Sequence, residues 1–290
     1  MRRMLTVAAV VMALFVSASS VGRAITGNFV EDFEHPYVGL AVFYDATGAF
    51  SHRCSGSLLS PRVFLTAGHC VEGVTTARVY FQQDAGANYD PVLEYDPVSG
   101  YPDTCLTQPC TTSDELYNYG YPAGFPNTKD IGLVILDEPI VLPEYGTLAA
   151  PGSLDVLATR RGRQDITFTA SGYGLTYTNP AQTISFRERL MATAQLVNLR
   201  SALTDGFNLQ TSNNPGIGGG TCFGDSGGPV FYGGYASNII VGVTSFGLSA
   251  NVCAGVDFAY RTDQEDVIAW ILAHAPEDER DLIQIVPLTS

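Results

Sequence analysis

Short apolar stretches alternate with turn residues along most of the chain. From about residue 37 onward, runs rich in Val, Ile, Phe, Tyr and Thr are bounded by Gly, Pro, Asn and Asp. The clearest runs are YVGLAVFY, SGSLLS, VFLTA, ARVYF, IGLVIL, ITFTASGYG, GPVFY and NIIVGVTSF. Runs of this kind are typical of β-strands in a sandwich or a pair of barrels. The sequence therefore predicts an all-β fold.

One helix is expected, close to the C-terminus. Residues 262–265 (TDQE) have the spacing of a capping box, in which a threonine and a glutamate satisfy backbone N–H groups at a helix start. Apolar residues follow at helical spacing, at Val267, Ile268, Ile271 and Leu272. We expect a helix over about 263–274, followed by a C-terminal tail over 276–290.

The segment from Gln82 to Asn127 is rich in Asp, Tyr, Pro and Gly. We interpret it as a long surface excursion between two strands. Its acidic side chains, such as Asp84, Asp90 and Asp96, offer oxygen ligands for calcium but lack the regular spacing of a calcium loop. A solvated loop is favoured over a metal site, so we predict no cofactor.

The N-terminus has the pattern of a secretory signal peptide. Arg2 and Arg3 precede an apolar run over residues 5–16, which small residues follow. The alternative is a transmembrane helix, but the run is much shorter than the ~20 apolar residues needed to cross a bilayer. We expect residues 1–24 to be a signal peptide, with or without a short pro-segment. The mature protein would be extracellular, without membrane contact.

Composition and charge narrow the possible partners. The chain has 290 residues, 46% of them hydrophobic, so it can bury a sizeable core. Its formal net charge of −14 argues against a nucleic acid partner. The six cysteines are expected to be paired in an oxidising compartment, and no CxxC pair or His/Cys cluster suggests zinc. Counting alone does not choose the disulfide pairing.

The strongest chemical signal is the motif GDSGGP at residues 224–229. A serine hydroxyl becomes an effective nucleophile only when a base removes its proton, and the oxyanion that forms needs donors fixed in advance. Glycines on both sides of Ser226 let the backbone turn sharply and bring N–H groups close to a substrate. A glycine-rich turn would explain a shorter match, whereas the full motif predicts a nucleophilic serine.

Two other segments supply candidate partners for this serine. His69 lies in LTAGHC, and Asp130 opens the apolar run DIGLVIL. An imidazole base must be held in one tautomer, and a buried carboxylate does this by accepting its Nδ1–H. Each signal is weak alone, because an Asp before a strand is commonly a turn residue. Together the three segments predict a Ser-His-Asp set.

In the order His, Asp, Ser, the motifs TAGHC, DIGLVIL and GDSGGP resemble those of the chymotrypsin and trypsin family of serine proteases (S1-type). The resemblance runs from about Ile25 to Trp270 and includes the segments HPY, SGYG and VTSFG. It implies two six-stranded antiparallel β-barrels, the first over about 37–150 and the second over about 160–260. Together with the helix they would form a peptidase domain over 25–275.

The resemblance also implies an activity and roles for individual residues. The chain would be a secreted serine endopeptidase that cleaves protein or peptide substrates through an acyl-enzyme, and we expect a monomer. The implied catalytic residues are His69, Asp130 and Ser226. The N–H groups of Gly224 and Ser226 would form the oxyanion hole.

Further roles follow from the same resemblance. Ser245 matches the serine that supports the triad aspartate, and the stretch from Ser245 through Phe246 to Gly247 would pair with the substrate backbone as an added strand. The implied disulfides are Cys54–Cys70 and Cys222–Cys253, which leaves Cys105 with Cys110.

The segment GRAITGN at residues 22–28 resembles an activation junction, although Ala24 stands where the family has Arg or Lys. Our hypothesis is that cleavage after Ala24, by signal peptidase itself, exposes Ile25. The new amine would then pair with Asp225, and no separate zymogen step would be needed.

Specificity is less well determined. Gly220 lies six residues before Ser226, where family members that cut after Arg or Lys carry an aspartate. With Gly247 at an open pocket mouth, large apolar or aromatic residues are favoured at the cut site. Asp257 complicates this, because its register is ambiguous: a side chain that points into the pocket would restore a basic preference.

Two other functions stay open. GDSGG also matches the GxSxG elbow of α/β-hydrolase esterases, with Asp257 and His274 downstream in the order that this fold uses. The elbow should lead into a helix, whereas a strand-like run follows here. The other alternative is a catalytically inactive relative that acts as a binding protein.

Overall fold

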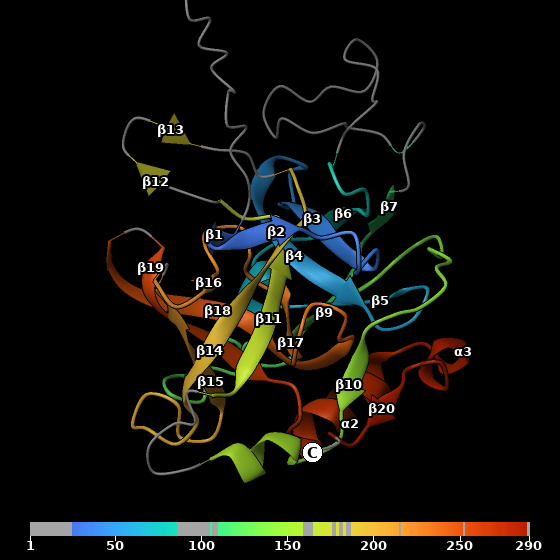
Figure 1. Cartoon of the computed structure of the whole chain (residues 1–290). Helices are drawn as coiled ribbons and strands as arrows, with labels where there is room; N and C mark the ends of the chain where they lie inside the picture. Colours follow the sequence, from blue (N-terminus) through green and yellow to red (C-terminus); the bar gives the residue numbers. More distant parts are fainter. Residues whose placement is uncertain are drawn as a thin grey trace, which may run out of the picture.

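Two barrel-like β-sheets make up most of the structure, a computed structural model (Figure 1). The residues expected to form a signal peptide lie outside the described part, as do Asp90 and Asp96. In the described part, no helix is long and apolar enough to span a bilayer. The described residues are 25–85, 105, 110–158, 165–175, 178–179, 182–183, 187–214, 216–251 and 253–288.

The first barrel is a sheet of seven antiparallel strands in the order β7-β6-β3-β4-β5-β9-β8. Only Asp114 separates β7 from β8, so one bend in the chain joins the two ends of the sheet. The strands are β3 (Val38–Tyr44), β4 (Phe50–Leu58), β5 (Val63–Thr66), β6 (Thr76–Tyr80), β7 (Cys110–Ser113), β8 (Glu115–Asn118) and β9 (Gly132–Ile135).

The prediction of a surface excursion over 82–127 is therefore wrong for residues 110–118. Residues 110–118 form β7 and β8, which pair with β6 and β9. Thr111 and Ser113 are buried, but polar residues in CTTSDELYN hid this pattern from the sequence reading.

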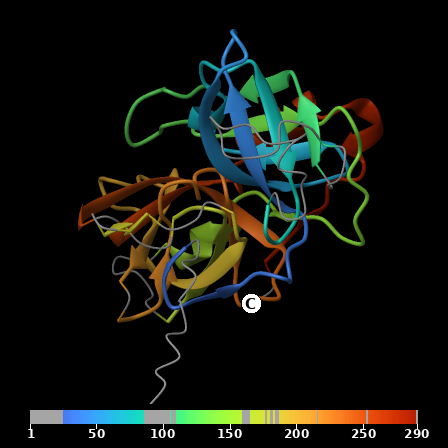
Figure 2. The same ribbon diagram turned by 90° about the horizontal axis from the view of Figure 1, so that it is seen from above.

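The second sheet contains a closed ring in the order β17-β11-β14-β15-β19-β18, with β17 pairing back onto β18. The ring strands are β11 (Thr167–Gly172), β14 (Leu190–Asn198), β15 (Asn208–Asn213), β17 (Pro229–Tyr232), β18 (Ile239–Asn251) and β19 (Ala254–Arg261). Three strands add to the ring from outside: β2 (Phe29–Glu31), β10 (Thr147–Ala149) and β20 (Ile285–Val286). The predicted all-β fold with two barrels is confirmed, and Figure 2 shows one barrel beside the other.

Smaller elements complete the fold. The strand β10 lies in the range expected for the first barrel but pairs in parallel with β18 of the second, because the chain crosses between the barrels there. The other elements are β1 (Thr26–Gly27) paired with β16 (Gly219–Gly220), β12 (Thr178–Asn179) paired with β13 (Gln182–Thr183), the helix α1 (Gly68–Val71) and the 3₁₀ helix η1 (Ser153–Leu157).

The C-terminal helix α2 (Glu265–His274) is present, but the capping box is not. Gln264 is the N-cap residue and makes no side-chain capping bond. Thr262 instead donates to Ile240 O at 3.3 Å. Its neighbour Asp263 accepts from the buried Arg261. The threonine and the aspartate are therefore engaged by the barrel, which leaves the helix start uncapped.

The expected tail is part of the fold up to residue 288. After α2 comes a short helix, α3 (Glu277–Arg280), and then β20, which pairs with β10. Glu279 is 5% exposed and accepts from the Arg62 side chain of the first barrel at 3.3 Å. The segment after α2 thus contacts both barrels and holds them together.

A buried polar cluster fixes the start of the domain against both barrels. Arg189 is 3% exposed and donates to the carbonyl groups of Asp32, Val38 and Phe81. Asp32 in turn accepts from the His35 ring at 2.9 Å. Because buried charges are tolerated only when they are hydrogen-bonded, this cluster specifies one way of joining these segments.

Candidate active site

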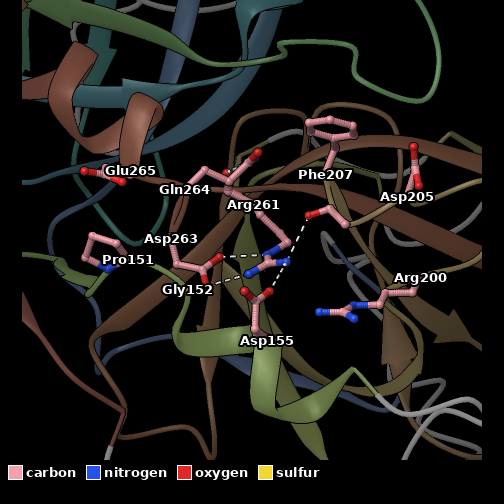
Figure 3. A pocket seen from close by; sticks show the side chains of 11 residues that line it. Pro151, Gly152, Asp155, Arg200, Asp205, Phe207, Arg261, Asp263, Gln264 and Glu265 are labelled. Carbon is pink, nitrogen blue, oxygen red and sulfur yellow. Dashed lines mark hydrogen bonds and ion pairs between the residues drawn. The ribbon is translucent and has the colours of Figure 1, made fainter.

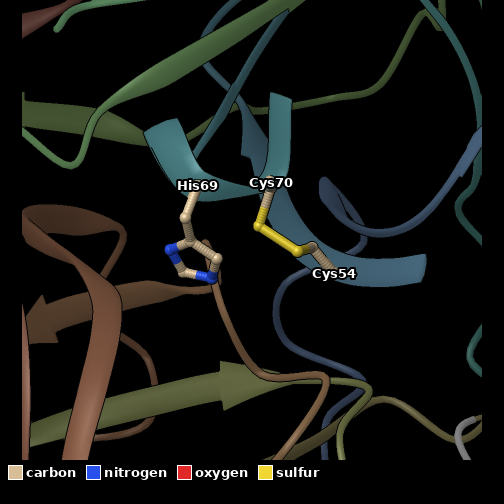
Figure 4. A group of neighbouring side chains, drawn as sticks. All are labelled: Cys54, His69 and Cys70. Atoms are coloured by element: carbon tan, nitrogen blue, oxygen red, sulfur yellow. A yellow bond between two sulfur atoms is a disulfide. The ribbon is translucent and has the colours of Figure 1, made fainter. Parts of the chain in front are cut away.

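His69 lies on the single-turn helix α1, directly after strand β5. The next residue, Cys70, forms a disulfide with Cys54 on β4, with Cα atoms 6.3 Å apart (Figure 4). The ligand atoms of Cys54, His69 and Cys70 lie within 4.8 Å of one another, but a thiolate is needed for metal binding and both sulfurs are in the disulfide. This bridge therefore anchors the histidine turn to the barrel.

Asp130 holds His69 at two points. Its carboxylate accepts from His69 Nδ1 at 2.9 Å and from the His69 backbone N–H at 2.8 Å. A third donor is the Ser245 hydroxyl, at 2.5 Å. Asp130 is 1% exposed, whereas the His69 side chain is 25% exposed. The imidazole is thus fixed at Nδ1, and this geometry requires the tautomer that leaves Nε2 as an acceptor.

Ser226 lies at the junction of the two barrels. Its carbonyl accepts from Ser55 N–H on β4 at 2.8 Å, and Gly227 N–H donates to Thr244 O, the residue before Ser245. Within the described part of the chain, the Ser226 hydroxyl has no hydrogen-bond partner, so the structure does not join it directly to His69. Such catalytic hydrogen bonds often form only when substrate is bound.

Gly227 shows how closely the serine loop approaches the histidine segment. It has a φ of 77°, and a Cβ added there would lie 2.1 Å from Thr66 Oγ1 and 2.7 Å from Ala67 N. A side chain is therefore excluded both by space and by backbone conformation. Only glycine lets the loop of Ser226 lie against residues 66–67, two positions before His69.

The N–H groups of Gly224 and Ser226 have no acceptor in the described part of the chain. Leu175 N–H donates to Phe223 O, and Gly228 N–H donates to Asp225 O, both at 2.8 Å. In a trans peptide the N–H points away from the C=O. These two bonds therefore turn the N–H groups of Gly224 and Ser226 away from the protein donors and leave them free for an external acceptor.

The structure does not record a contact between Ile25 and Asp225. Ile25 is fully buried and packs with Leu190 and Ala192 on β14. Asp225 is also fully buried and accepts from Gly174 N–H at 2.7 Å and Cys222 N–H at 2.8 Å. Burial raises the pKa of Asp225 to about 7, with a smaller contribution from the charge of Asp257.

Asp257 points inward, which resolves the ambiguous register. Strand pairing sets it opposite Gly247, where an added Cβ would lie 3.4 Å from Asp257 Oδ1. Its other oxygen accepts from Thr221 N–H, next to Gly220, at 2.7 Å. Asp257 is 8% exposed. Its carboxylate therefore lies between the segments of Gly220 and Gly247, the two predicted pocket positions.

The environment of Asp257 is polar but contains no cation among the described residues. Asn213 Nδ2 donates to it at 3.3 Å, and Thr244, which lines the same small cavity, has a buried hydroxyl without a partner. Burial raises the pKa of Asp257 to about 6. An uncompensated carboxyl beside an unpaired hydroxyl can accept a donor from a ligand.

An aromatic groove of about 320 Å³ lies beside His69. Phe246 forms one wall, stacked on Phe258 with ring centres 4.5 Å apart. Tyr121 and Phe125 come from the segment expected to be a solvated loop. Sequence reasoning missed both, and their signal was the density of aromatic residues in YNYGYPAGF.

The structure contains two more disulfides. Cys222 is bonded to Cys253, and Cys105 to Cys110. The family resemblance implies the first of these pairs, and the second is the pair that remains. Cys222 directly precedes the serine loop, so its bridge ties that loop to the hairpin between β18 and β19.

The esterase alternative does not fit this structure. Pro229 opens strand β17, where an α/β-hydrolase would have a helix. His274 ends helix α2, where its Nδ1–H donates to Trp270 O at 2.9 Å and its ring packs on Tyr117. Both the all-β fold and the position of this histidine exclude the esterase arrangement.

A larger groove, of about 840 Å³, lies on the second barrel (Figure 3). None of the predicted catalytic residues lines it. Its central charge, Arg261, is bonded to Asp263 at 2.8 Å and to Asp155 at 3.0 Å. Burial alone would lower the pKa of Arg261, but Asp263 and Asp155 outweigh it and raise the pKa. These pairs hold η1 against the end of β19, which is a structural role.

Comparison with known proteins identifies the family. A family model with the description Trypsin matches residues 25–271. The match covers most of the chain, so the protein belongs to the trypsin family of serine proteases.

Two curated relatives illustrate the degree of similarity. Serine protease 7 of Drosophila melanogaster is 29% identical over 232 residues, which cover 78% of this chain and 58% of the fly protein. Brachyurin of Leptuca pugilator is 31% identical over 212 residues, covering 71% of this chain and 81% of brachyurin. The chain thus spans less than two thirds of the fly relative.

Solved structures share the fold. HL collagenase matches with a TM-score of 0.61 at 18% identity, over 86% of this chain and 97% of the collagenase. A scabies mite inactivated protease paralogue, S-D1, matches with a TM-score of 0.55 at 16% identity, over 82% of this chain and 92% of the paralogue. At this level of identity the likeness concerns the fold alone.

Proposed function

We propose that this chain is a secreted serine endopeptidase in which Ser226 is the nucleophile, His69 the base and Asp130 its orienting carboxylate. The observation that carries the proposal is the buried Asp130 carboxylate, 2.9 Å from His69 Nδ1, beside a loop with two unengaged N–H groups. Three disulfides and the leader pattern support secretion.

The proposed reaction has two halves. Ser226 Oγ attacks the peptide carbonyl carbon while its proton passes to His69 Nε2, and the imidazolium is stabilised by Asp130. The carbonyl oxygen becomes an oxyanion that the N–H groups of Gly224 and Ser226 receive. His69 then protonates the leaving amine, and a water molecule, deprotonated by the same ring, hydrolyses the acyl-enzyme.

The substrate backbone would bind as an extra strand. Strand β18 is paired with β17 only as far as Val243, so its edge from Ser245 to Gly247 is open on the side of the cleft. A peptide added there would place successive side chains toward alternating faces. The aromatic groove with Tyr121, Phe125 and Phe246 would receive apolar residues that precede the cut site.

A catalytically inactive binding protein is the second candidate. The observation in its favour is the unbonded Ser226 hydroxyl, and inactivated paralogues adopt the same fold. Against it, every side chain that the reaction needs is present. Hydrolysis of a peptide library by the mature wild-type chain would reject the inactive alternative, and its absence would reject the proposed peptidase.

At the cut site we propose a preference for Lys or Arg, in place of the apolar preference inferred from Gly220 alone. Asp257 is expected to supply the missing charge at the pocket floor. Replacing it by Asn should lower kcat/KM for Arg substrates by about 100-fold and change Leu substrates little. The measurement is kcat/KM for peptide substrates that differ only in the residue before the cleaved bond.

The pH dependence of this preference gives a second check on the same residue. With its pKa raised to about 6, Asp257 is protonated below that pH and charged above it. The Arg-to-Leu ratio of kcat/KM should therefore rise between pH 5 and pH 8 in wild type and stay flat in Asp257→Asn. Asp45→Asn, at a half-buried turn residue of the first barrel, serves as control, and a ratio that both variants share with wild type would exclude Asp257 from specificity.

We further propose that the active form begins at Ile25. Asp225 is buried without a cation among the described residues, and a free α-amine would supply the partner that a buried carboxylate needs. A chain that starts at Ile25 should be at least about 100-fold more active than one that retains Ala24. N-terminal sequencing of the secreted protein should give ITGNF. Another start, or equal activity of the two chains, would contradict this route.

A further inference from the structure

Ser55 is a buried serine of the first barrel that touches the catalytic loop of the second. It lies on β4 with no exposed surface, directly after Cys54, whose disulfide anchors the His69 turn. Neither the family motifs nor the proposed mechanism gives its hydroxyl a task. A fully buried hydroxyl is normally hydrogen-bonded, and its partners reveal what it holds.

The polarity of the Ser55 hydrogen bonds is unambiguous. Tyr173 N–H can only donate, and it reaches Ser55 Oγ at 2.9 Å. Gly224 O can only accept, so the Ser55 hydroxyl donates to it at 2.8 Å. The Ser55 backbone N–H donates to Ser226 O at 2.8 Å. One residue therefore fixes the carbonyl groups on both sides of Asp225.

These contacts matter because Gly224 is able to rotate. Its φ of 95° is open to glycine but rare for other residues. Because glycine has no side chain, hydrogen bonds must hold the two peptides that flank it. The preceding peptide is held by Leu175 N–H on Phe223 O. The following peptide is held at both ends, by the Ser55 hydroxyl on Gly224 O at 2.8 Å and by its own Asp225 N–H on Cys222 O at 3.1 Å. Without the hydroxyl, the Gly224 carbonyl loses its donor and only the longer bond holds this peptide.

The space around Ser55 leaves little room for an alternative arrangement. An added Cβ at Gly172 would lie 2.9 Å from Ser55 Oγ, and one at Gly228 would lie 3.2 Å from Ser55 Cβ. The loop of Ser226, the end of strand β11 and Ser55 are thus in close contact. The hydroxyl acts at the point where the two barrels meet, next to the free N–H groups of Gly224 and Ser226.

We propose that Ser55 is a positioning residue for the oxyanion hole, whose hydroxyl holds the Gly224 peptide so that the N–H groups of Gly224 and Ser226 converge on the substrate oxygen. This inference rests on the proposed peptidase function. Ser55 does not touch the substrate. Its effect should appear where charge develops on that oxygen, and not in the binding of the uncharged substrate.

The test compares Ser55→Ala with Ser57→Ala. Ser57 lies two positions along the same strand, is fully buried and has a hydroxyl without a partner, so it controls for the loss of a buried oxygen. Ser55→Ala should lower kcat by about 10-fold to 100-fold, less than the ~10²–10³ of losing a donor, with KM within about twofold. Ser57→Ala should change neither.

A pair of inhibitors separates positioning from packing. A peptide trifluoromethyl ketone forms an oxyanion with the serine, whereas the corresponding peptide amide forms none. Ser55→Ala should weaken the ketone by the same factor as kcat and leave the amide unchanged. If Ser55→Ala does not fold, Ser55→Gly removes the same hydroxyl without leaving a methyl group, and it should weaken the ketone by at least about threefold.

The outcomes distinguish the two levels of the argument. Wild type without peptidase activity would refute the proposed function and this inference with it. Active wild type together with unchanged kcat and ketone binding in a folded Ser55 variant would overturn the inference alone. Equal losses in Ser57→Ala, or a ketone and an amide weakened alike, would also overturn it, because they indicate packing.

Discussion

Replacing Ser226 with alanine is expected to lower kcat by about 10⁶-fold, which is the loss typical of removing a serine nucleophile. The fold should not change, because the Ser226 hydroxyl has no hydrogen-bond partner among the described residues. Hydrolysis of a peptide substrate and the melting temperature, measured on the same preparation, check both parts of the prediction.

Ser153→Ala is a suitable control for this variant. Ser153 lies on η1, outside the cleft, and its hydroxyl makes no hydrogen bond in the described part of the chain. Its activity and melting temperature should equal those of wild type. The nucleophile assignment would be wrong if Ser226→Ala kept more than about one hundredth of the wild-type kcat, a loss far smaller than removal of a nucleophile causes.

Asp130→Asn is expected to lower kcat by about 10⁴-fold at neutral pH. The amide keeps the shape of the carboxylate but offers N–H groups where His69 Nδ1 now donates. The ring would then favour the tautomer with a proton on Nε2, which cannot accept the serine proton. The kcat of the variant should be measured with a substrate that wild type cleaves well.

Stability separates this effect from a loss of structure. Ser245 Oγ and His69 N–H also donate to Asp130, so Asp130→Asn should lower the free energy of unfolding by about 1–3 kcal/mol. A folded variant with less than a tenfold change in kcat would show that Asp130 does not orient the base.

The family and the two-barrel fold were predicted from the sequence and confirmed, and the segments of the proposed triad were predicted in the same way, because each depends on local signals. GDSGGP and TAGHC are short, and glycines at 224 and 227 are required by backbone conformation. Asp130 was found because it precedes an apolar run that becomes strand β9. Features of this kind need no knowledge of how distant strands pair.

Features that depend on pairing could not be predicted. Whether Asp257 points into the pocket depends on its register opposite Gly247, and irregular pairing along β18 shifts that register. Likewise, the clamp of Ser55 on Gly224 joins residues far apart in the chain. A serine in a strand gives no sequence signal that its hydroxyl holds a loop of the other barrel.

The helix start shows a local signal that failed for a tertiary reason. TDQE at residues 262–265 has the spacing of a capping box, yet Asp263 is engaged by Arg261 and Thr262 by the barrel. The salt bridge of a buried arginine outweighs a capping bond that would contribute about 1 kcal/mol. Local propensity therefore placed the helix but not its first residue.

The most direct test of the account is to label the mature protein with a fluorophosphonate and to locate the adduct by mass spectrometry. Only a serine activated by a neighbouring base reacts readily with this reagent. We predict one adduct, on Ser226, that is lost in Ser226→Ala and strongly slowed in Asp130→Asn. A mature wild-type protein that is folded but carries no adduct on Ser226 would contradict the account.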